Sequence, residues 1–359
     1  MTITRIPVGG SAPYEVVLGA GVLAELPALI GPAARTVVVL HPADLGEIAR
    51  PVCGVLEKAG YEVHAEPVPG GEAAKDITVA AALWSRLAAL RVTRTDALVG
   101  IGGGATTDLA GFVAATWLRG VPIVLLPTTL LGIADAAVGG KTAVNIAEGK
   151  NLVGAFHPPA GVLADLAVLE SLPRAEYVSG LAEVIKVGFI ADPVILDLVE
   201  ADPEGAVLPH GPHAHDLIER AVAVKARVVS GDPREAGQRE ILNYGHTLGH
   251  AIERVEGYRI RHGEAVAIGM VFAAEVARLA GRLPADVAER HRRVLAAVGL
   301  PTSYLAGAWP DLRAAMALDK KSRGAVLRMI VLAGLGTPVT LDGPPEDLLA
   351  RAFAEVAAR

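Results

Sequence analysis

The chain has few cysteines, few aromatic residues and no excess of positive charge. Cys53 is the single cysteine among 359 residues, so no internal disulfide can form, and a reducing compartment is the simplest expectation. Aromatic residues make up 4%, so the core must be built mainly from aliphatic side chains. There are 33 Lys and Arg against 39 Asp and Glu, and this formal charge of −6 argues against a nucleic-acid-binding protein.

Long hydrophobic runs are also missing. The most apolar region, residues 111–140, is interrupted by Arg119, Pro122, Pro127 and Asp135. It therefore contains no uninterrupted span of about 20 apolar residues, the length needed to cross a membrane. The first residues carry no basic stretch followed by an apolar segment, so a signal peptide is not expected. We therefore expect a soluble, cytoplasmic protein.

Short apolar runs and helical patterns alternate in the first half of the chain. Strands are expected at residues 14–18, 36–40, 61–68, 97–101, 122–126 and 162–165, with helices at 22–29, 45–59, 77–90 and 108–117. Such alternation with uniformly apolar strands predicts a parallel sheet covered by helices on both faces.

Helical periodicity dominates after residue 172. Helices are expected at 177–190, 215–229, 241–254, 265–279 and 285–298, followed by a hairpin at 326–332 with 338–341 and a last helix from residue 345. The sequence thus predicts an α/β protein with a Rossmann-like parallel-sheet domain at residues 1–172 and a mostly helical domain at residues 173–359.

Three consecutive glycines, Gly102–Gly104, follow a predicted strand and precede a predicted helix. Glycines let the backbone approach a phosphate closely, and a helix N-terminus offers free N–H groups. The spacing is not G-x-G-x-x-G, because Thr107 stands where the third glycine would fall, so a tight turn without a ligand is the alternative.

Two further segments favour a nucleotide over a simple turn. The segment 69–75 combines Gly70 and Gly71 with Glu72, an acid for a ribose, and Lys75, a base for a phosphate. Thr128 and Thr129 follow the next strand, where sheets of this kind bind their ligands.

A polar set of residues stands in the predicted helix 241–254 and just before it. Arg239, Asn243, His246 and His250 are offset by 0, 4, 7 and 11, so in one continuous helix they would share a face. Exposed faces usually carry Glu and Lys, and Gly245 and Gly249 indicate close packing against a neighbour. A merely solvent-exposed face is the alternative.

Histidines and a carboxylate suggest a metal site. His246 and His250 have the spacing of metal ligands but lack the acid of H-E-x-x-H. His262 is a third candidate, and Glu183 interrupts an otherwise apolar helix on the same face as Lys186. An acid there needs a metal, a lysine or a helix start as its partner. Two histidines, a carboxylate and an open position would suit a catalytic Zn²⁺.

The sequence contains a further histidine cluster and a set of cations in unusual surroundings. His210, His213 and His215 lie in a loop rich in Pro and Gly, which is typical of a surface. Lysines that follow paired glycines often bind an anion. Several cations of this chain stand in apolar or glycine-rich surroundings; they are Arg119, Lys141, Lys150, Lys186, Lys225, Arg239, Lys320 and Lys321. The set suggests a substrate with a phosphate and a carboxylate.

These motifs together resemble the 3-dehydroquinate synthases, sugar-phosphate cyclases of the shikimate pathway. The resemblance covers roughly residues 10 to 345. Each motif alone is weak, but the ordered set is specific: Gly-Gly-Gly-x-x-x-Asp at 102–108, Leu-Pro-Thr-Thr-Leu-Leu at 126–131, Asp135-Ala-Ala-Val-Gly-Gly-Lys141, and the segments 149–156, 182–186, 243–252, 262–265 and 319–321.

The resemblance implies conversion of 3-deoxy-D-arabino-heptulosonate 7-phosphate to 3-dehydroquinate and phosphate, with tightly held NAD⁺ and one divalent metal, usually Zn²⁺ or Co²⁺. NAD⁺ would oxidise the C5 hydroxyl, phosphate would leave by elimination, the ketone would be reduced back, and an aldol step would close the ring. A homodimer is implied, with Arg119 near the neighbouring subunit's site.

The resemblance also implies a role for each matching residue. Glu183, His246 and His262 would be the metal ligands. Lys141, Asn151, His250 and one of Lys320 and Lys321 would face the phosphate, Lys225 and Arg239 the carboxylate, and Asp135, Lys186 and Asn243 the sugar hydroxyls. The positions that match NAD contacts are Gly70, Gly71, Glu72, Lys75, Gly102, Gly103, Gly104, Ala105, Thr106, Thr107, Asp108, Thr128, Thr129, Lys141, Lys150, Val168, Leu169, Glu170 and Ser171.

One position departs from the family pattern. After the strand 36–40 the family usually carries an Asp that meets the adenosine ribose, but His41 stands here. Asp44, three residues on, is the candidate substitute.

Three alternatives stay open. A metal-dependent NAD polyol dehydrogenase of the glycerol-dehydrogenase type would not need Lys141, Asn151, Lys225 and Arg239 together, because its substrates lack phosphate and carboxylate. A cyclase acting on sedoheptulose 7-phosphate or glucose 6-phosphate would not need the Arg239 and Lys225 pair. A catalytically inactive nucleotide-binding or scaffold protein would have little reason to keep the three candidate metal ligands.

Overall fold

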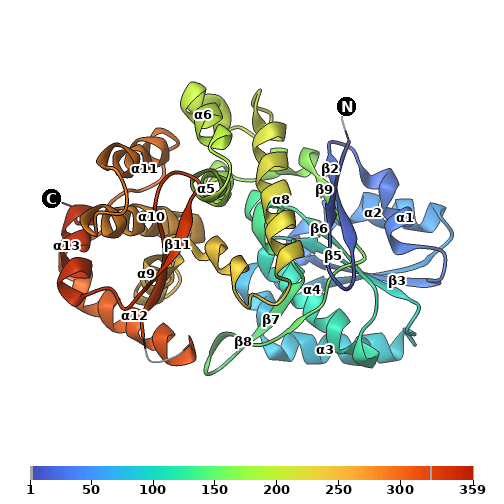
Figure 1. Cartoon of the computed structure of the whole chain (residues 1–359). Helices are drawn as coiled ribbons and strands as arrows, with labels where there is room; N and C mark the ends of the chain where they lie inside the picture. The colour runs from blue at the N-terminus through green and yellow to red at the C-terminus, as the bar shows by residue number, and fades with distance from the viewer. Residues whose placement is uncertain (1–2, 324–325, 359) are drawn as a thin grey trace. The chain divides into compact units, whose positions relative to one another are not determined.

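The computed structural model describes residues 3–323 and 326–358, without the side chains of residues 318–323. The chain forms two compact units (Figure 1). The first unit contains the residues up to Leu172 together with Lys225–Arg234, and the second contains Pro173–Val224 and the residues from Glu235 onward. The sequence predicted that every residue after 172 belongs to the second domain, whereas residues 225–234 group with the first unit.

A seven-stranded sheet forms the centre of the first unit, in the order β1-β2-β9-β6-β5-β3-β4. All neighbouring strands are parallel except β1, which pairs antiparallel with β2 at the edge. The strands are β1 (Thr4–Val8), β2 (Tyr14–Gly19), β3 (Thr36–Pro42), β4 (Glu62–Val68), β5 (Ala97–Gly102), β6 (Ile123–Pro127) and β9 (Gly161–Asp165). The six predicted strands are confirmed, whereas β1 was not predicted.

Helices cover both faces of this sheet, as the apolar strands predicted. On one face, Val37 and Val39 of β3 share a buried cluster with Val52 of α2. On the other, Gly100 of β5 lies so close to α4 that a Cβ there would come within 2.7 Å of the Ala110 methyl. The helices are α1 (Leu26–Ile30), α2 (Gly46–Lys58), α3 (Ile77–Ala89) and α4 (Gly104–Thr116).

Short helical turns and one separate hairpin complete the first unit. The hairpin joins β7 (Lys141–Ile146) to β8 (Gly149–Phe156) and was not predicted. Short turns follow several strands at their carboxyl ends, which parallel strands place on one side of a sheet; among them are η2 (Ala43–Leu45), η3 (Gly71–Lys75), η5 (Gly132–Ala136) and η6 (Leu166–Ser171). The other turns are η1 (Leu23–Glu25) and η4 (Trp117–Arg119).

The second unit is mostly helical, with one antiparallel hairpin. Its helices are α5 (Arg174–Ile190), α6 (Val194–Ala201), α7 (Pro203–Ala206), α8 (Ala214–Gly231, of which the part from Lys225 belongs to the first unit), α9 (His246–Val255), α10 (His262–Leu279), α11 (Ala285–Ala297), α12 (Trp309–Arg323) and α13 (Glu346–Val356). The turns η7 (Gln238–Asn243) and η8 (Ala306–Ala308) and the hairpin of β10 (Arg328–Leu332) and β11 (Pro338–Asp342) complete it. Within the described residues, no helix is long and apolar enough to cross a membrane.

Helix α10 is buried along most of its length, and glycines let its neighbours approach closely. A Cβ on Gly263 would overlap the Ser179 carbonyl oxygen of α5, and one on Gly269 would overlap the Gly245 carbonyl oxygen. A Cβ on Gly249 of α9 would lie 3.3 Å from the Ala265 oxygen. The prediction that Gly245 and Gly249 mark close packing is therefore confirmed.

The prediction of one continuous helix over residues 241–254 is wrong. Turn η7 ends at Asn243, and Gly245 then adopts a left-handed conformation with φ +81°, which glycine tolerates at no steric cost. Helix α9 begins only at His246. Arg239 and Asn243 therefore do not share a helix face with His246 and His250.

A buried histidine in this core predicts how stability depends on pH. His291 of α11 stacks on Phe189 with 3.6 Å between ring centroids, its Nδ1 donates to the Val287 carbonyl oxygen at 2.8 Å, and the Tyr244 hydroxyl lies 2.9 Å from its Nε2. Burial lowers the pKa of His291 to about 3. In the unfolded chain the imidazole binds a proton near pH 6.5, so stability is lost as the pH falls from about 6.5 toward 3, by up to roughly 5 kcal/mol.

We expect His291→Gln to flatten this pH dependence in urea unfolding measured between pH 7 and pH 5, even though the variant is less stable. His64→Gln, which alters a partly exposed histidine of β4, serves as the control for the replacement of a histidine outside this core. Equal slopes for His291→Gln and the parent would contradict the assignment.

Candidate functional site

The glycine turn of the first unit lies at the carboxyl end of β5. Gly102 closes the strand with φ +151° and Gly104 opens α4. The Thr128 N–H donates to the Gly102 carbonyl oxygen at 2.9 Å, so the turn after β6 lies beside the glycine turn. A Cβ on Gly103 would lie only 3.2 Å from Thr129 Cγ2. The structure therefore brings the predicted Gly102–Asp108 loop, Thr128 and Thr129 together at a helix N-terminus, where phosphates bind in many proteins.

The second glycine turn lies at the same edge of the sheet. It follows β4, and the Asp44 carboxylate from η2 reaches it, since a Cβ on Gly70 would lie 3.7 Å from Asp44 Oδ1. Segment Val168–Ser171 lies in η6 after β9, again at a carboxyl end. The predicted nucleotide residues therefore follow the carboxyl ends of five strands that are adjacent in the sheet, β9, β6, β5, β3 and β4.

Side chains of η3 bind the β7–β8 hairpin. Glu72 Oε1 accepts a hydrogen bond from Asn145 at 2.7 Å and lies 3.3 Å from Lys150 Nζ. The buried Lys75 ammonium lies 2.5 Å from Asp108 Oδ2 and also donates to Asn151 Oδ1. The structure therefore gathers predicted nucleotide residues with Asn151, which the resemblance assigned to the phosphate.

Asp108 of α4 is held in an environment that disfavours its charge. Burial raises the pKa of this carboxyl to about 6, although the Lys75 ammonium opposes the shift. Asp108 lies just beyond the first turn of α4, and an acid with this pKa is a perturbed group of the kind that gathers at functional sites.

The remaining predicted residues of the first unit lie in three places. Lys225 is buried, and its ammonium donates to both the carboxylate and the backbone oxygen of Asp135. Lys141 is exposed at the start of β7. Arg119 is exposed in η4, which follows α4 and precedes β6, so it lies at the amino end of the strands, opposite the glycine turn. Arg119 therefore lies apart from the other predicted site residues of this unit.

Glu183, His246 and His262 meet in the second unit. Glu183 comes from α5, and the histidines are the first residues of α9 and α10. The Nε2 atoms of His246 and His262 lie 3.6 and 3.4 Å from Glu183 Oε1, and one nitrogen or oxygen of each residue lies within 4.8 Å of the others. This is the compact group of nitrogen and oxygen donors that a divalent metal requires.

Hydrogen bonding around the cluster also fits a metal. Glu183 Oε1 is buried, and no hydrogen bond reaches it within the described part of the chain. His246 Nδ1 lies 3.1 Å from the Tyr244 carbonyl oxygen and His262 Nδ1 lies 3.2 Å from Glu253 Oε1. In the neutral rings these acceptors hold the proton on Nδ1 and turn the Nε2 lone pairs toward Glu183. An orphaned buried oxygen facing two such lone pairs is satisfied by a cation.

The electrostatics of the cluster are strongly coupled. Burial alone would raise the pKa of Glu183, but the Lys186 ammonium and the two imidazoles hold it well below its usual range. Burial and Lys186 hold the pKa of His246 well below its usual range. Burial would lower the pKa of His262, yet Glu183 and Glu253 raise it to about 10.

The other predicted residues of the second unit lie on neighbouring elements. The buried Lys186 donates to Glu183 Oε2, and the exposed His250 ring lies 5.1 Å from His246 and 6.3 Å from His262 between centroids. Arg239 is buried in η7, and Asn243 donates to Glu235 Oε1 at 2.8 Å. The predictions for Lys320 and Lys321 concern side chains outside the described residues.

Sequence reasoning missed Glu253, Tyr244 and Glu235. Glu253 lies seven residues after His246, two turns along the same face of α9, so helical spacing could have identified it. Tyr244 acts through its backbone oxygen, which carries no sequence signal. Glu235 has φ +56° and faces Asn243, and neither feature can be read from residue types.

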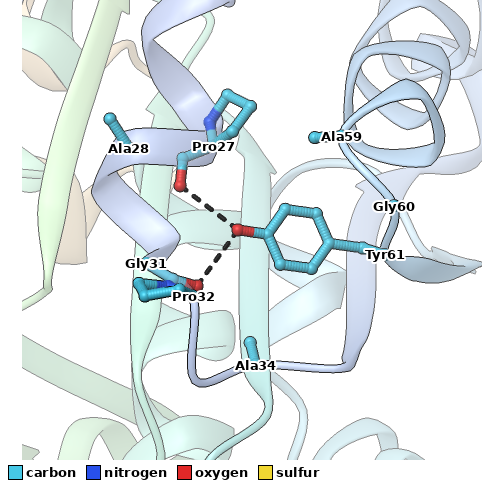
Figure 2. Close-up of a pocket in the computed structure, with 8 residues that line it drawn as sticks. All are labelled: Pro27, Ala28, Gly31, Pro32, Ala34, Ala59, Gly60 and Tyr61. Carbon is cyan, nitrogen blue, oxygen red and sulfur yellow. Dashed lines mark hydrogen bonds between the residues drawn. The ribbon is translucent and has the colours of Figure 1, made fainter.

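A separate hollow lies between α1 and the residues that precede β3 and β4, and Figure 2 shows the side chains that line it. It is lined by uncharged residues: Pro27, Ala28, Gly31, Pro32, Ala34, Ala59, Gly60 and Tyr61. The Tyr61 hydroxyl lies 3.0 Å from the carbonyl oxygen of Gly31, which follows α1, and 3.3 Å from that of Pro27, in the first turn of α1 (Figure 2). These residues precede β3 and β4, whereas the glycine turns follow strands, so the hollow is not part of the site.

Comparison with known proteins places this geometry in a family. The family models for the N-terminal and C-terminal parts of 3-dehydroquinate synthase match residues 66–179 and 180–322. A 3-dehydroquinate synthase from Thermobifida fusca is 66% identical over 357 residues, covering 99% of this chain and 97% of the relative.

Two solved structures are similar over the whole chain. A 2-deoxy-scyllo-inosose synthase complexed with carbaglucose-6-phosphate, NAD⁺ and Co²⁺ is 28% identical with a TM-score of 0.89, covering 99% of this chain and 100% of that one. A 2-epi-5-epi-valiolone synthase from Streptomyces hygroscopicus with NAD⁺ and Zn²⁺ is 27% identical with a TM-score of 0.88, covering 98% and 99%. The resemblance drawn from the motifs is confirmed, and the chain belongs to the 3-dehydroquinate synthase family.

Proposed function

We propose that the protein is an NAD⁺- and divalent-metal-dependent lyase that converts 3-deoxy-D-arabino-heptulosonate 7-phosphate into 3-dehydroquinate and phosphate. The observation that carries the proposal is the convergence of Glu183, His246 and His262 around a buried carboxylate oxygen with no hydrogen bond from the described residues, in a chain of this family. The similar solved synthases contain NAD⁺ with Co²⁺ or Zn²⁺.

The first domain, residues 1–172, would hold NAD⁺ at the carboxyl edge of its sheet. The N–H groups at the start of α4 would receive the pyrophosphate, with Thr128 and Thr129 beside them, and Asp44 would meet the ribose in place of the usual acid. When bound, NAD⁺ supplies a hydride acceptor that returns the hydride later. Lys75 fixes the β7–β8 hairpin against this edge through Asp108 and Asn151.

The second domain, residues 173–359, would hold Zn²⁺ or Co²⁺ on Glu183, His246 and His262. When bound, such an ion supplies Lewis acidity to a hydroxyl or ketone oxygen of the substrate. Lys186 keeps Glu183 ionised and fixes its second oxygen, so the first oxygen stays directed at the histidines. Burial of the pair excludes water from this side of the carboxylate.

The cations would bind the two anionic ends of the substrate. Arg239 is buried, and the planar fork of its guanidinium matches the geometry of a carboxylate, to which Lys225 would add a second charge. The phosphate would be held by Lys141, Asn151, His250 and one of Lys320 and Lys321, and the hydroxyls by Asp135, Lys186 and Asn243. These assignments come from the family resemblance, and the burial of Arg239, Lys186 and Lys225 supports them.

The protein would work as a homodimer in which Arg119 serves the neighbouring subunit. Leu118 and Arg119 are successive non-glycine residues with φ +49° and +68°, a conformation that costs on the order of 1 kcal/mol or more per residue and is concentrated at functional sites. The exposed Arg119 lies at the opposite edge of the sheet from the glycine turn of its own chain. We place the activity in the cytoplasm, where Cys53 stays reduced.

A coupled assay tests this function. The protein is mixed with 3-deoxy-D-arabino-heptulosonate 7-phosphate, trace NAD⁺ and Zn²⁺ or Co²⁺, and phosphate release is followed together with absorbance of NADH. Phosphate released well beyond the NAD⁺ supplied, without lasting NADH, is expected of an internally redox-neutral cyclase. NADH that accumulates with simple polyols, without phosphate release, would indicate the dehydrogenase alternative. Turnover of sedoheptulose 7-phosphate or glucose 6-phosphate instead would indicate another cyclase.

Arg239→Lys is expected to weaken substrate binding far more than NAD⁺ binding. Loss of one bond of a charged fork costs about 1.5–3 kcal/mol, which raises KM by roughly 10–100-fold. The Kd for NAD⁺ should stay within about twofold, and Arg259→Lys, at a guanidinium side chain that is 81% exposed, is the matched control. An equal loss of both affinities would count against a role of Arg239 in carboxylate binding.

A further inference from the structure

The two histidines of the metal cluster are held by different partners. His246 Nδ1 meets the carbonyl oxygen of Tyr244, two residues earlier in its own chain segment, so backbone geometry fixes that ring. His262 Nδ1 instead meets a side chain, the carboxylate of Glu253, at 3.2 Å. The orientation of His262 therefore depends on a residue that can be replaced without changing the backbone.

We infer that Glu253 is a positioning residue that orients His262 toward the metal and fixes the proton of its neutral ring on Nδ1. The inference rests on the proposed metal site and adds a residue behind it. A carboxylate on the far nitrogen of a metal-binding imidazole holds the ring plane and strengthens the donor nitrogen.

The fold makes this contact specific. Glu253 lies seven residues after His246 on α9, two turns along the same face of the helix. This face therefore carries one proposed metal ligand, His246, and the carboxylate that contacts the other histidine ligand, His262. The Glu253 side chain is only 17% exposed, which limits competition from water for its oxygen. The nearby acid Glu264 is directed elsewhere, since it accepts from the Arg261 backbone at 3.2 Å and pairs with its guanidinium.

Co²⁺ binding to the metal-free full-length protein tests the inference. Three variants are compared with the parent: Glu253→Ala, which removes the acceptor, Glu253→Gln, which keeps an acceptor oxygen without the charge, and Glu264→Gln, which removes a neighbouring charge without touching the ring. The readouts are the Kd for Co²⁺ from chelator competition, the visible spectrum of the bound Co²⁺, and the thermal midpoint of each metal-free protein.

Glu253→Ala should raise the Kd for Co²⁺ by roughly 10–100-fold and change the visible spectrum, with a metal-free midpoint near that of the parent. Glu253→Gln should retain most of the affinity, and Glu264→Gln should bind Co²⁺ within about twofold of the parent. Equal affinities of Glu253→Ala and the parent would overturn the inference while leaving the metal site intact. Equal losses in Glu253→Ala and Glu264→Gln would also overturn it, because general charge and not orientation would be responsible. A parent that binds no Co²⁺ would overturn the metal site and this inference together.

If Glu253→Ala does not fold, Glu253→Gln decides the outcome through its spectrum. An amide oxygen that still accepts from Nδ1 predicts a parent-like coordination spectrum with a modestly raised Kd. A spectrum that shows a lost nitrogen ligand in a folded Glu253→Gln protein would contradict orientation by hydrogen bonding.

Discussion

Glu183→Gln is expected to abolish stoichiometric binding of a divalent metal and to lower kcat by about a thousandfold or more. Glutamine keeps the size of the side chain but removes the charge that faces the two histidines. Lewis-acid stabilisation of a developing oxyanion contributes several kcal/mol, which corresponds to this loss of rate. The variant should also be less stable, by roughly 3–5 kcal/mol, because the Lys186 ammonium, 2% exposed, loses its charged partner.

His246→Ala separates the loss of metal from the loss of the ion pair. This variant removes a ligand but leaves Glu183 and Lys186 in contact, so it should lose metal and turnover while keeping more stability than Glu183→Gln. His210→Ala, at an exposed histidine of the same unit, should retain both metal and activity. Metal content, kcat and the midpoint of urea unfolding are measured on all three. Full activity in a demonstrably metal-free His246→Ala protein would refute the ligand assignment.

Uniformly buried strands had the clearest sequence signal, although the partly exposed β4 was also predicted. Val37–Leu40 of β3 is buried on both faces, so an apolar run was a sufficient signal for an interior parallel strand. Strand β1 and the β7–β8 hairpin were missed because their apolar residues alternate with exposed, polar or glycine positions. The helix pattern over 241–254 was misread because Gly245 breaks it through a φ value, which residue types alone do not show.

The site was predictable as an ordered set of motifs and unpredictable as a set of contacts. Glu183, His246 and His262 come from three helices, and periodicity alone does not show that their ends meet. The contact of Lys75 with Asn151 joins residues 76 positions apart through a hairpin that was not predicted. Residue types therefore indicated the chemistry, and tertiary packing decided which of these residues share a cluster.

Gly269→Ala is expected to destabilise the second unit although alanine is the better helix former. In a helix interior alanine is favoured over glycine by about 1 kcal/mol. At Gly269 of α10, however, the new Cβ would overlap the Gly245 carbonyl oxygen and lie 2.9 Å from the Gly245 carbonyl carbon and 3.0 Å from the Gly249 nitrogen. These are backbone atoms, so no side-chain rotation can relieve the overlap, and α9 must move away from α10. Overpacking of this kind costs about 3 kcal/mol, which outweighs the gain in propensity.

The same displacement should weaken the metal site, because α9 begins with His246 directly after Gly245 and α10 begins with His262. We expect Gly269→Ala to lower the thermal midpoint of the metal-free protein by several degrees and to raise the Kd for Co²⁺ by about tenfold or more. Gly54→Ala is the matched control, since Gly54 lies inside α2 with no neighbouring atom within 4 Å of its built Cβ, and it should stabilise the protein by up to about 1 kcal/mol. If both variants gain stability alike, helix propensity governs both positions and the close approach of α9 to α10 does not constrain the ligands. If Gly269→Ala loses stability and metal affinity together, the packing of two glycines is what holds His246 and His262 at a common distance from Glu183.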